Sequence, residues 1–199
     1  MKQQIFIING SGGVGKDTFI DTVGCVIKEL SSKYQYIKDV FPLENFEGME
    51  IENHSSVEKV KDIAYECGWN GGKTEKDRKF LSDLKLLLTE YNDLPFTELK
   101  EYVRCFYHNV MYVLLFLHIR EPKEIERAKQ EFGAKTILVK RDSVKHIKSN
   151  MADKGVFDYN YDIVINNSGT KDDLKVIAED FVKDFCKDSL KSEYGPASN

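Results

Sequence analysis

Short apolar runs alternate along the chain with longer stretches of helical periodicity. Five runs, each short and rich in β-branched or large apolar residues, predict strands at 5–8, 34–40, 110–119, 136–139 and 163–165. Continuous apolar runs of this length are typical of strands that are buried on both faces of a sheet. The run at 34–40 gives the weakest indication of the five.

Between these runs, apolar residues recur every three or four positions, as on one face of a helix. Such patterns cover 18–30, 125–132 and 174–185, and three more fall within 57–106. Strands that alternate with helices predict an α/β fold, a five-stranded parallel sheet with helices on both faces. The interval 41–109 carries three helical patterns, so we expect a helical insertion between strands 2 and 3. We expect one domain over 1–187 and a frayed tail at 188–199.

A glycine-rich loop follows the first predicted strand and opens the first predicted helix. It fits the pattern G-x-x-x-x-G-K, the phosphate-binding loop. Its glycines let the backbone curl so that successive N–H groups point into one concavity, and the helix N-terminus adds partial positive charge. Lys16 then reaches the β- and γ-phosphates as a point charge. We therefore expect a nucleotide phosphate to be bound by Gly10, Ser11, Gly12, Gly13, Val14, Gly15, Lys16, Asp17 and Thr18.

Asp17 departs from the pattern, which has Ser or Thr at this position to coordinate Mg²⁺. A carboxylate is also a hard oxygen ligand, so Asp17 could hold the metal directly or through water. Alternatively, Asp17 only caps the start of the helix. Thr18 is placed to meet the α-phosphate.

The sequence Gly-Lys-Asp-Thr at 15–18 resembles the P-loop kinases of small phosphorylated substrates, in particular phage-type deoxynucleoside monophosphate kinases and animal-type phosphomevalonate kinases. Segments 76–84, 119–122, 139–141 and 161–170 are also similar to that family. The resemblance implies a three-layer P-loop fold that uses ATP and Mg²⁺. It also implies transfer of the γ-phosphoryl group to the phosphate of a small metabolite. A (deoxy)nucleoside monophosphate is the first choice of acceptor, and a phosphomevalonate-like compound is the second.

Two of the five arginines follow predicted strands: Arg120 after the third and Arg141 after the fourth. Ligands of open parallel sheets bind at the carboxyl ends of the strands. Transfer between two phosphates needs cations there, and the planar guanidinium binds phosphate bidentately. We expect Arg120 to hold the acceptor phosphate and Arg141 to contact the transferring group; the alternative for both is a surface ion pair.

The third strand ends in His118, where the general Walker B strand ends in an aspartate. Histidine cannot replace a hard carboxylate for Mg²⁺, so Glu121 or Asp17 must contribute if the metal is held conventionally. His118 itself is interpreted as a packed strand-end residue. The missing aspartate also favours a different class of function, an ATP-binding regulatory protein without transferase activity.

Acceptor-binding candidates lie in and before the insertion. Arg78 could bind the acceptor phosphate and Asp83 a hydroxyl or base, with Lys79 beside them; a solvated helix face is the alternative. Asp39, near the end of the second predicted strand, is a further candidate. The mixed charge of 141–161 predicts a lid that excludes water, although a plain surface loop has the same composition.

Asn167 follows the fifth strand, where related kinases approach the nucleotide base. Just after it, Thr-Lys-Asp-Asp at 170–173 fits the guanine signature of GTPases. The same residues fit a helix cap, with Thr170 as N-cap and Asp173 three residues on, and this is the favoured interpretation.

Composition excludes several classes. A net charge of −4, from 29 basic and 33 acidic residues, offers no broad positive field for a nucleic acid. Four widely spaced cysteines suit a reducing compartment better than a disulfide framework or a zinc site. The longest apolar stretch, 110–117, is too short to span a bilayer. We expect a cytoplasmic enzyme, a monomer or homodimer, that binds a small phosphorylated substrate and neither nucleic acid nor membrane.

Overall fold

The computed structural model describes residues 3–34, 50–144 and 155–194. The chain divides into two compact units. The first comprises Met1–Asn53 and Val110–Asn199 and carries the sheet, and the second is His54–Asn109.

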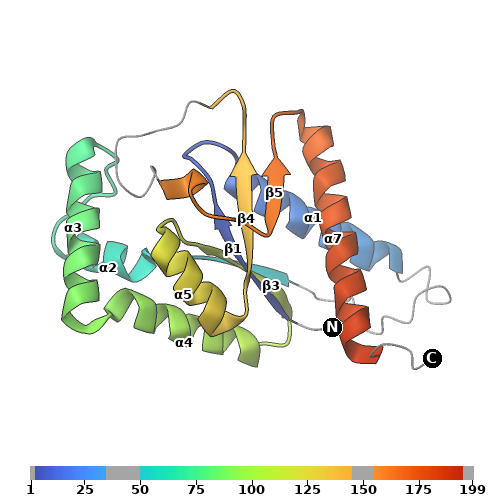
Figure 1. Ribbon diagram of the computed structural model, residues 1–199, viewed down its shortest axis with the longest axis horizontal. Helices are drawn as coiled ribbons and strands as arrows, with labels where there is room; N and C mark the ends of the chain where they lie inside the picture. The colour runs from blue at the N-terminus through green and yellow to red at the C-terminus, as the bar shows by residue number, and fades with distance from the viewer. Residues whose placement is uncertain (1–2, 35–49, 145–154, 195–199) are drawn as a thin grey trace. The chain divides into compact units, whose positions relative to one another are not determined.

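The sheet has five strands: β1 (Gln4–Asn9), β2 (Glu50–Ser55), β3 (Tyr112–His118), β4 (Lys135–Lys140) and β5 (Ile163–Asn166). Their order is β2-β3-β1-β4-β5, so β1 is central and β3 and β4 flank it (Figure 1). Phe6 pairs with Phe116 of β3 and with Lys135 of β4, both in parallel register. The predicted α/β class with a parallel five-stranded sheet is confirmed.

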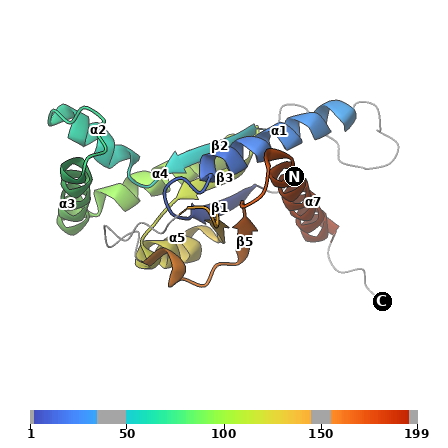
Figure 2. The same cartoon turned by 90° about the horizontal axis from the view of Figure 1, so that it is seen from above.

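Helices cover both faces of this sheet. On one face α1 (Lys16–Tyr34) and α7 (Lys171–Tyr194) contact each other. On the other face α5 (Pro122–Phe132) contacts β1 and β4. Figure 2 places α5 on the side of β1 opposite to α1. A short 3₁₀ helix, η1 (Gly155–Phe157), precedes β5. Among the helices of the described ranges, none combines the length and the apolar character needed to cross a bilayer.

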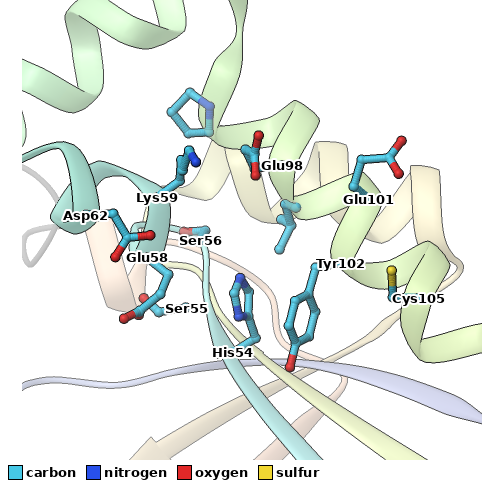
Figure 3. Close-up of a pocket in the computed structure, with 12 residues that line it drawn as sticks. His54, Ser55, Ser56, Glu58, Lys59, Asp62, Glu98, Glu101, Tyr102 and Cys105 are labelled. Atoms are coloured by element: carbon cyan, nitrogen blue, oxygen red, sulfur yellow. The ribbon is translucent and has the colours of Figure 1, made fainter. Parts of the chain in front are cut away.

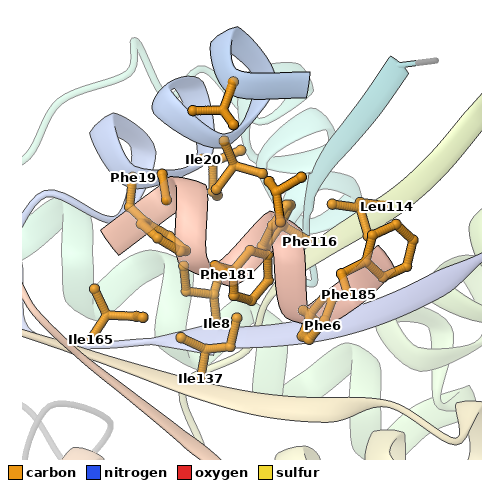
Figure 4. Packing of buried hydrophobic residues seen from close by; sticks show 14 of the residues in the cluster. Phe6, Ile8, Phe19, Ile20, Leu114, Phe116, Ile137, Ile165, Phe181 and Phe185 are labelled. Carbon is orange, nitrogen blue, oxygen red and sulfur yellow. The ribbon is translucent and has the colours of Figure 1, made fainter. Parts of the chain in front are cut away.

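The core lies between the sheet and the α1–α7 pair and is rich in phenylalanine (Figure 4). Phe6 stacks on Phe116 with ring centroids 5.7 Å apart, and Phe19 of α1 meets Phe181 of α7 edge-on at 5.5 Å. Aromatic pairs in these geometries contribute beyond the area they bury. Ile5 and Ile7, which alternate with Phe6 along β1, are also fully buried. β1 is therefore buried on both faces, as its continuous apolar run predicts.

The second unit consists of α2 (Glu58–Glu66), α3 (Glu75–Asn92) and α4 (Leu94–His108). A capping box between Thr74 and Asp77 starts α3. Asp93, in the left-handed region at φ 55°, separates α3 from α4. The three helices lie between β2 and β3 in the sequence, so the predicted helical insertion between strands 2 and 3 is confirmed.

Two expectations about boundaries differ from the structure. The second strand is β2 at Glu50–Ser55, which lies inside the interval 41–109 that was expected to be helical. Of the strand expected at 34–40, Tyr34 belongs to α1, and residues 35–40 lie outside the described ranges. β2 reads Glu-Ile-Glu-Asn-His-Ser and occupies the sheet edge, where pairing with β3 is possible without an apolar run. The tail expected to fray from 188 is helical as far as Tyr194, because helix-breaking Gly195 and Pro196 come only afterwards.

Candidate functional site

The glycine loop joins the end of β1 to the start of α1. Gly10, Gly13 and Gly15 have φ values of +147°, +81° and +89°. A Cβ at Gly10 would lie 2.5 Å from the carbonyl oxygen of Val139, and one at Gly15 would collide with the side-chain amide nitrogen of Asn167. Among the described residues, a Cβ at Gly13 would meet no atom within 4 Å. Close packing therefore requires two of these glycines, and backbone conformation favours all three.

Lys16 is the first residue of α1, and its ammonium lies against the loop. Its Nζ donates to the carbonyl oxygens of Gly10 at 2.7 Å and Ser11 at 3.2 Å. The Ser11 hydroxyl oxygen is buried and has no hydrogen-bond partner within the described ranges. A cation held in a curled backbone, next to an unsatisfied buried hydroxyl, is an environment that fits an anion such as a phosphate group.

Asn167 ties the loop to the ends of two strands. Its backbone N–H donates to Lys140 O at 2.8 Å, and its side-chain Nδ2 donates to Val14 O at 2.8 Å. The residue is buried. In this structure the Asn167 side chain therefore supports the loop backbone, a role that differs from the predicted contact with a nucleotide base.

Asn9, the last residue of β1, is a polar hub that the sequence analysis did not single out. It is only 1% exposed, and its Oδ1 accepts from the N–H of Gly10 at 2.8 Å. Its Nδ2 donates to Arg120 O at 3.1 Å and to the Tyr161 hydroxyl at 2.8 Å. A polar residue at the end of an otherwise apolar strand was the one signal available for it.

The two predicted arginines lie at the carboxyl ends of the strands that flank β1. Arg120 follows β3 and Arg141 follows β4, and both side chains are exposed. Since parallel strands end at one edge of a sheet, both residues share that edge with the glycine loop. Glu121, predicted as a metal ligand, occupies the N-cap position of α5.

Asp17 is 80% exposed, and its Oδ1 lies 3.6 Å from Nε2 of His118. The packed strand-end interpretation of His118 did not foresee this neighbour. No group of three or more His, Cys, Asp or Glu in the described ranges could hold a metal ion. Mg²⁺ in phosphate-transfer sites usually takes one or two carboxylates and completes its shell with phosphates and water, so Asp17 fits a nucleotide-borne Mg²⁺.

The predicted acceptor residues Arg78, Lys79 and Asp83 lie on α3 in the second unit, and Asp39 lies outside the described residues. Lys79 pairs with Asp83 at 2.7 Å, with both side chains exposed. That pair matches the solvated-face alternative. Of the expected lid at 141–161, residues 145–154 lie outside the described ranges.

The second unit also contains a hollow of about 300 Å³ between β2, α2 and α4 (Figure 3). His54 stacks on Tyr102 in its wall, with ring centroids 3.7 Å apart. Around this pair lie Lys59 and the acidic side chains of Glu58, Asp62, Glu98 and Glu101. With carboxylates outnumbering the single ammonium group, the lining suits hydroxyl or amine groups better than a phosphate.

The guanine-signature alternative is not supported by local geometry. Thr170 N–H and Oγ1 both donate to Asp173 Oδ2 at 2.8 Å, and Asp173 N–H donates back to Thr170 Oγ1 at 3.2 Å. These bonds lower the pKa of the Asp173 carboxyl. This is the capping box that the sequence favoured.

No protein-family model matches the chain, and no curated protein sequence matches it either. Among solved structures, the chain is similar to APS kinase from Mycobacterium tuberculosis, with 13% identity, 92% of this chain and 98% of the other covered, and a TM-score of 0.38. For shikimate kinase from Aquifex aeolicus the identity is 11%, 97% of this chain and 100% of the other are covered, and the TM-score is 0.38. For thymidylate kinase from Ehrlichia chaffeensis the identity is 13%, 96% of this chain and 90% of the other are covered, and the TM-score is 0.24. Similarities this low say nothing about substrate or mechanism, which must come from this chain's own residues.

Proposed function

We propose that this chain is a kinase that transfers the γ-phosphoryl group of ATP·Mg²⁺ to the phosphate of a (deoxy)nucleoside monophosphate. The observation that carries the proposal is the glycine loop between β1 and α1. Its backbone requires glycine, and its lysine ammonium lies against the loop carbonyls. Two arginines follow the neighbouring strands at the same edge of the sheet.

Each of these groups has a part in the proposed transfer. Bound ATP·Mg²⁺ would supply the phosphoryl group and the metal's charge. The loop N–H groups and Lys16 bind and orient the donor phosphates, Arg120 binds the acceptor phosphate, and Arg141 stabilises charge on the transferring group. An acceptor oxygen forms the new P–O bond as the bond to ADP breaks. The acceptor is already anionic, so the reaction demands no strong general base.

Acceptor recognition is assigned in this proposal to Asp39, Arg78, Lys79 and Asp83, with Asp17 and Glu121 as the carboxylates available to Mg²⁺. A phosphomevalonate-type acceptor is the alternative of the same class. One observation favours a second function, ATP binding without transfer: His118 stands beside Asp17 where a Walker B aspartate would be expected.

The test is Mg·ATP-dependent ADP release with a panel of nucleoside and deoxynucleoside monophosphates plus phosphomevalonate. One acceptor should stimulate release well above the ATP-only background. Lys16→Ala should lower the stimulated rate on the order of 10²-fold or more, the effect of removing a preorganised donor. Lys28→Ala is the matched control, because it removes the same charge from an exposed position on α1.

The outcomes separate the candidates. Stimulation by phosphomevalonate alone would change the acceptor and keep the reaction type. ATP binding without stimulation by any acceptor would favour the non-catalytic function. A Lys16→Ala rate close to that of Lys28→Ala would overturn the assignment of the loop.

A further inference from the structure

The side-chain amide of Asn9 makes hydrogen bonds to three other residues. The residue is buried at the end of the central strand, and its carbonyl oxygen and amide nitrogen together make three hydrogen bonds. A buried amide that makes these bonds fixes the relative positions of the groups that it joins, since breaking any one bond leaves a buried polar group unsatisfied.

The three partners belong to three different parts of the proposed site. Gly10 begins the phosphate loop, Arg120 lies two residues after the end of β3, and Tyr161 lies two residues before β5. The sequence separations are 1, 111 and 152 residues. Asn9 is therefore a point at which the donor side and the proposed acceptor arginine are connected through one side chain.

We propose that Asn9 and Tyr161 are positioning residues that hold the main chain of Arg120 in register with the phosphate loop. The inference rests on the proposed function. Asparagine suits this position because one amide both accepts from Gly10 and donates twice. Aspartate could accept but not donate, and an apolar residue could do neither.

The Tyr161 hydroxyl oxygen accepts a hydrogen bond from Asn9. Burial raises the pKa of Tyr161 to about 12, against a lowering contribution from the Asn9 hydrogen bond. The hydroxyl therefore stays neutral at physiological pH and accepts the second N–H of Asn9. Removing only this oxygen withdraws one bond from Asn9 while leaving the aromatic ring in place.

The test compares Tyr161→Phe with Tyr159→Phe in the full chain. Tyr159 is a matched control because its ring packs 5.1 Å from that of Tyr161, but its hydroxyl donates to Glu126 of α5. Tyr161→Phe should lower kcat by about tenfold and Asn9→Ala by about 10²-fold, because sub-ångström to 1 Å displacements of positioned groups have effects of this size. The KM for ATP should change by less than about threefold in Tyr161→Phe, because Asn9 still accepts from the Gly10 N–H at the start of the loop in that variant.

Two further readouts separate positioning from a general loss of stability. The double variant N9A/Y161F should lose no more kcat than Asn9→Ala, since Tyr161 acts through Asn9. Amide hydrogen exchange should accelerate in peptides that contain Gly10 and Arg120 in Tyr161→Phe and not in Tyr159→Phe.

The activity of the wild-type protein distinguishes failure of the proposed function from failure of the positioning role. If the wild-type protein transfers phosphoryl to no acceptor, the proposed function fails and this inference falls with it. If the wild-type protein is active but Tyr161→Phe matches Tyr159→Phe in kcat and in exchange, the positioning role is wrong and the kinase proposal stands. An equal loss of ATP affinity and kcat in Tyr161→Phe would also overturn it, because the bond between Asn9 and Tyr161 would then support nucleotide binding alone.

Discussion

Gly15 and Gly13 have similar backbone conformations but differ in the room available for a side chain, so their alanine variants can be compared directly. Both have φ near +80° to +90°, but only at Gly15 would a Cβ collide with Asn167. Gly13→Ala should cost about 1 kcal/mol, from the backbone conformation alone. Gly15→Ala should cost more, about 2–3 kcal/mol, and should weaken nucleotide binding, because Asn167 can no longer donate to Val14.

Urea unfolding and titration with a fluorescent nucleotide measure both effects. The two alanine variants should differ in unfolding free energy and also in nucleotide affinity. Equal unfolding free energies would mean that the Asn167 contact adds nothing to the strain at Gly15, and the support of the loop by the Asn167 side chain would be wrong.

Arg141 has an exposed side chain after β4. Since the proposal gives it the transferring group, its role should appear in the rate of transfer more than in ATP binding. Arg141→Ala should lower turnover about 10²-fold while ATP affinity changes little, if the guanidinium meets charge that develops only during transfer. Arg104→Ala is the control, since Arg104 is an exposed arginine paired with Glu101 on α4. Steady-state kinetics and equilibrium ATP binding decide the matter; equal losses in both would make Arg141 a simple ATP-binding residue.

Asp162, the residue before β5, links β5 to β4 and α5. Its carboxylate accepts from the N–H and hydroxyl of Thr136, at 2.8 and 2.9 Å, and from Lys129 of α5 at 2.8 Å. Burial raises the pKa of this carboxyl, but the bonds from Lys129 and Thr136 outweigh it and leave the pKa below its ordinary value. The charged carboxylate is therefore the form that holds β4, β5 and α5 together.

Asp162→Asn should accordingly lower the unfolding free energy at neutral pH by about 1–2 kcal/mol, the worth of charge-assisted bonds reduced for partial exposure. Because the folded pKa is lowered, the wild-type advantage exists above the unfolded pKa near 3.8 and disappears as pH falls through the folded value. Urea unfolding at about pH 7 and about pH 3 measures this. Asp180→Asn, which removes an exposed pair with Lys183, should change little at either pH. A constant gap between wild-type and Asp162→Asn protein would contradict the linkage.

How far the sequence predicts each element depends on where its information lies. β1, β3 and β4 carry continuous apolar runs, so their burial could be inferred from their own residues. The run of β5 predicts burial too, but this strand lies at the other edge of the sheet and its Val164 is exposed. β2 has one isoleucine among polar residues, and only its pairing at the sheet edge makes it a strand. The glycine loop was predictable because its chemistry is local. The bonds from Asn9 to Arg120 and Tyr161 were not, since contacts across more than a hundred residues leave no periodic pattern.

The two units carry different parts of the proposed site. The loop, Asn9 and both arginines belong to the unit that carries the sheet, while Arg78, Lys79 and Asp83 belong to the helical unit. A nucleotide that binds only the first group should therefore stabilise the sheet unit directly. Its effect on the helical unit then measures how strongly the two units are coupled in unfolding.

A non-hydrolysable ATP analogue with Mg²⁺, at about a hundred times its Kd, should stabilise the folded sheet unit by about 2.7 kcal/mol, equivalent to roughly 5–10 °C in Tm. Lys16→Ala should abolish the shift, because the loop would lose its point charge toward the phosphates. Removing Mg²⁺ with EDTA should reduce the shift, since the phosphate charge would then face the Asp17 carboxylate without a cation between them. Asp17→Asn should narrow the difference between the shifts with and without Mg²⁺, because the metal would lose a charged ligand. If wild-type and Asp17→Asn proteins respond equally to EDTA, Asp17 serves as a helix cap and Mg²⁺ is held through phosphate and water alone.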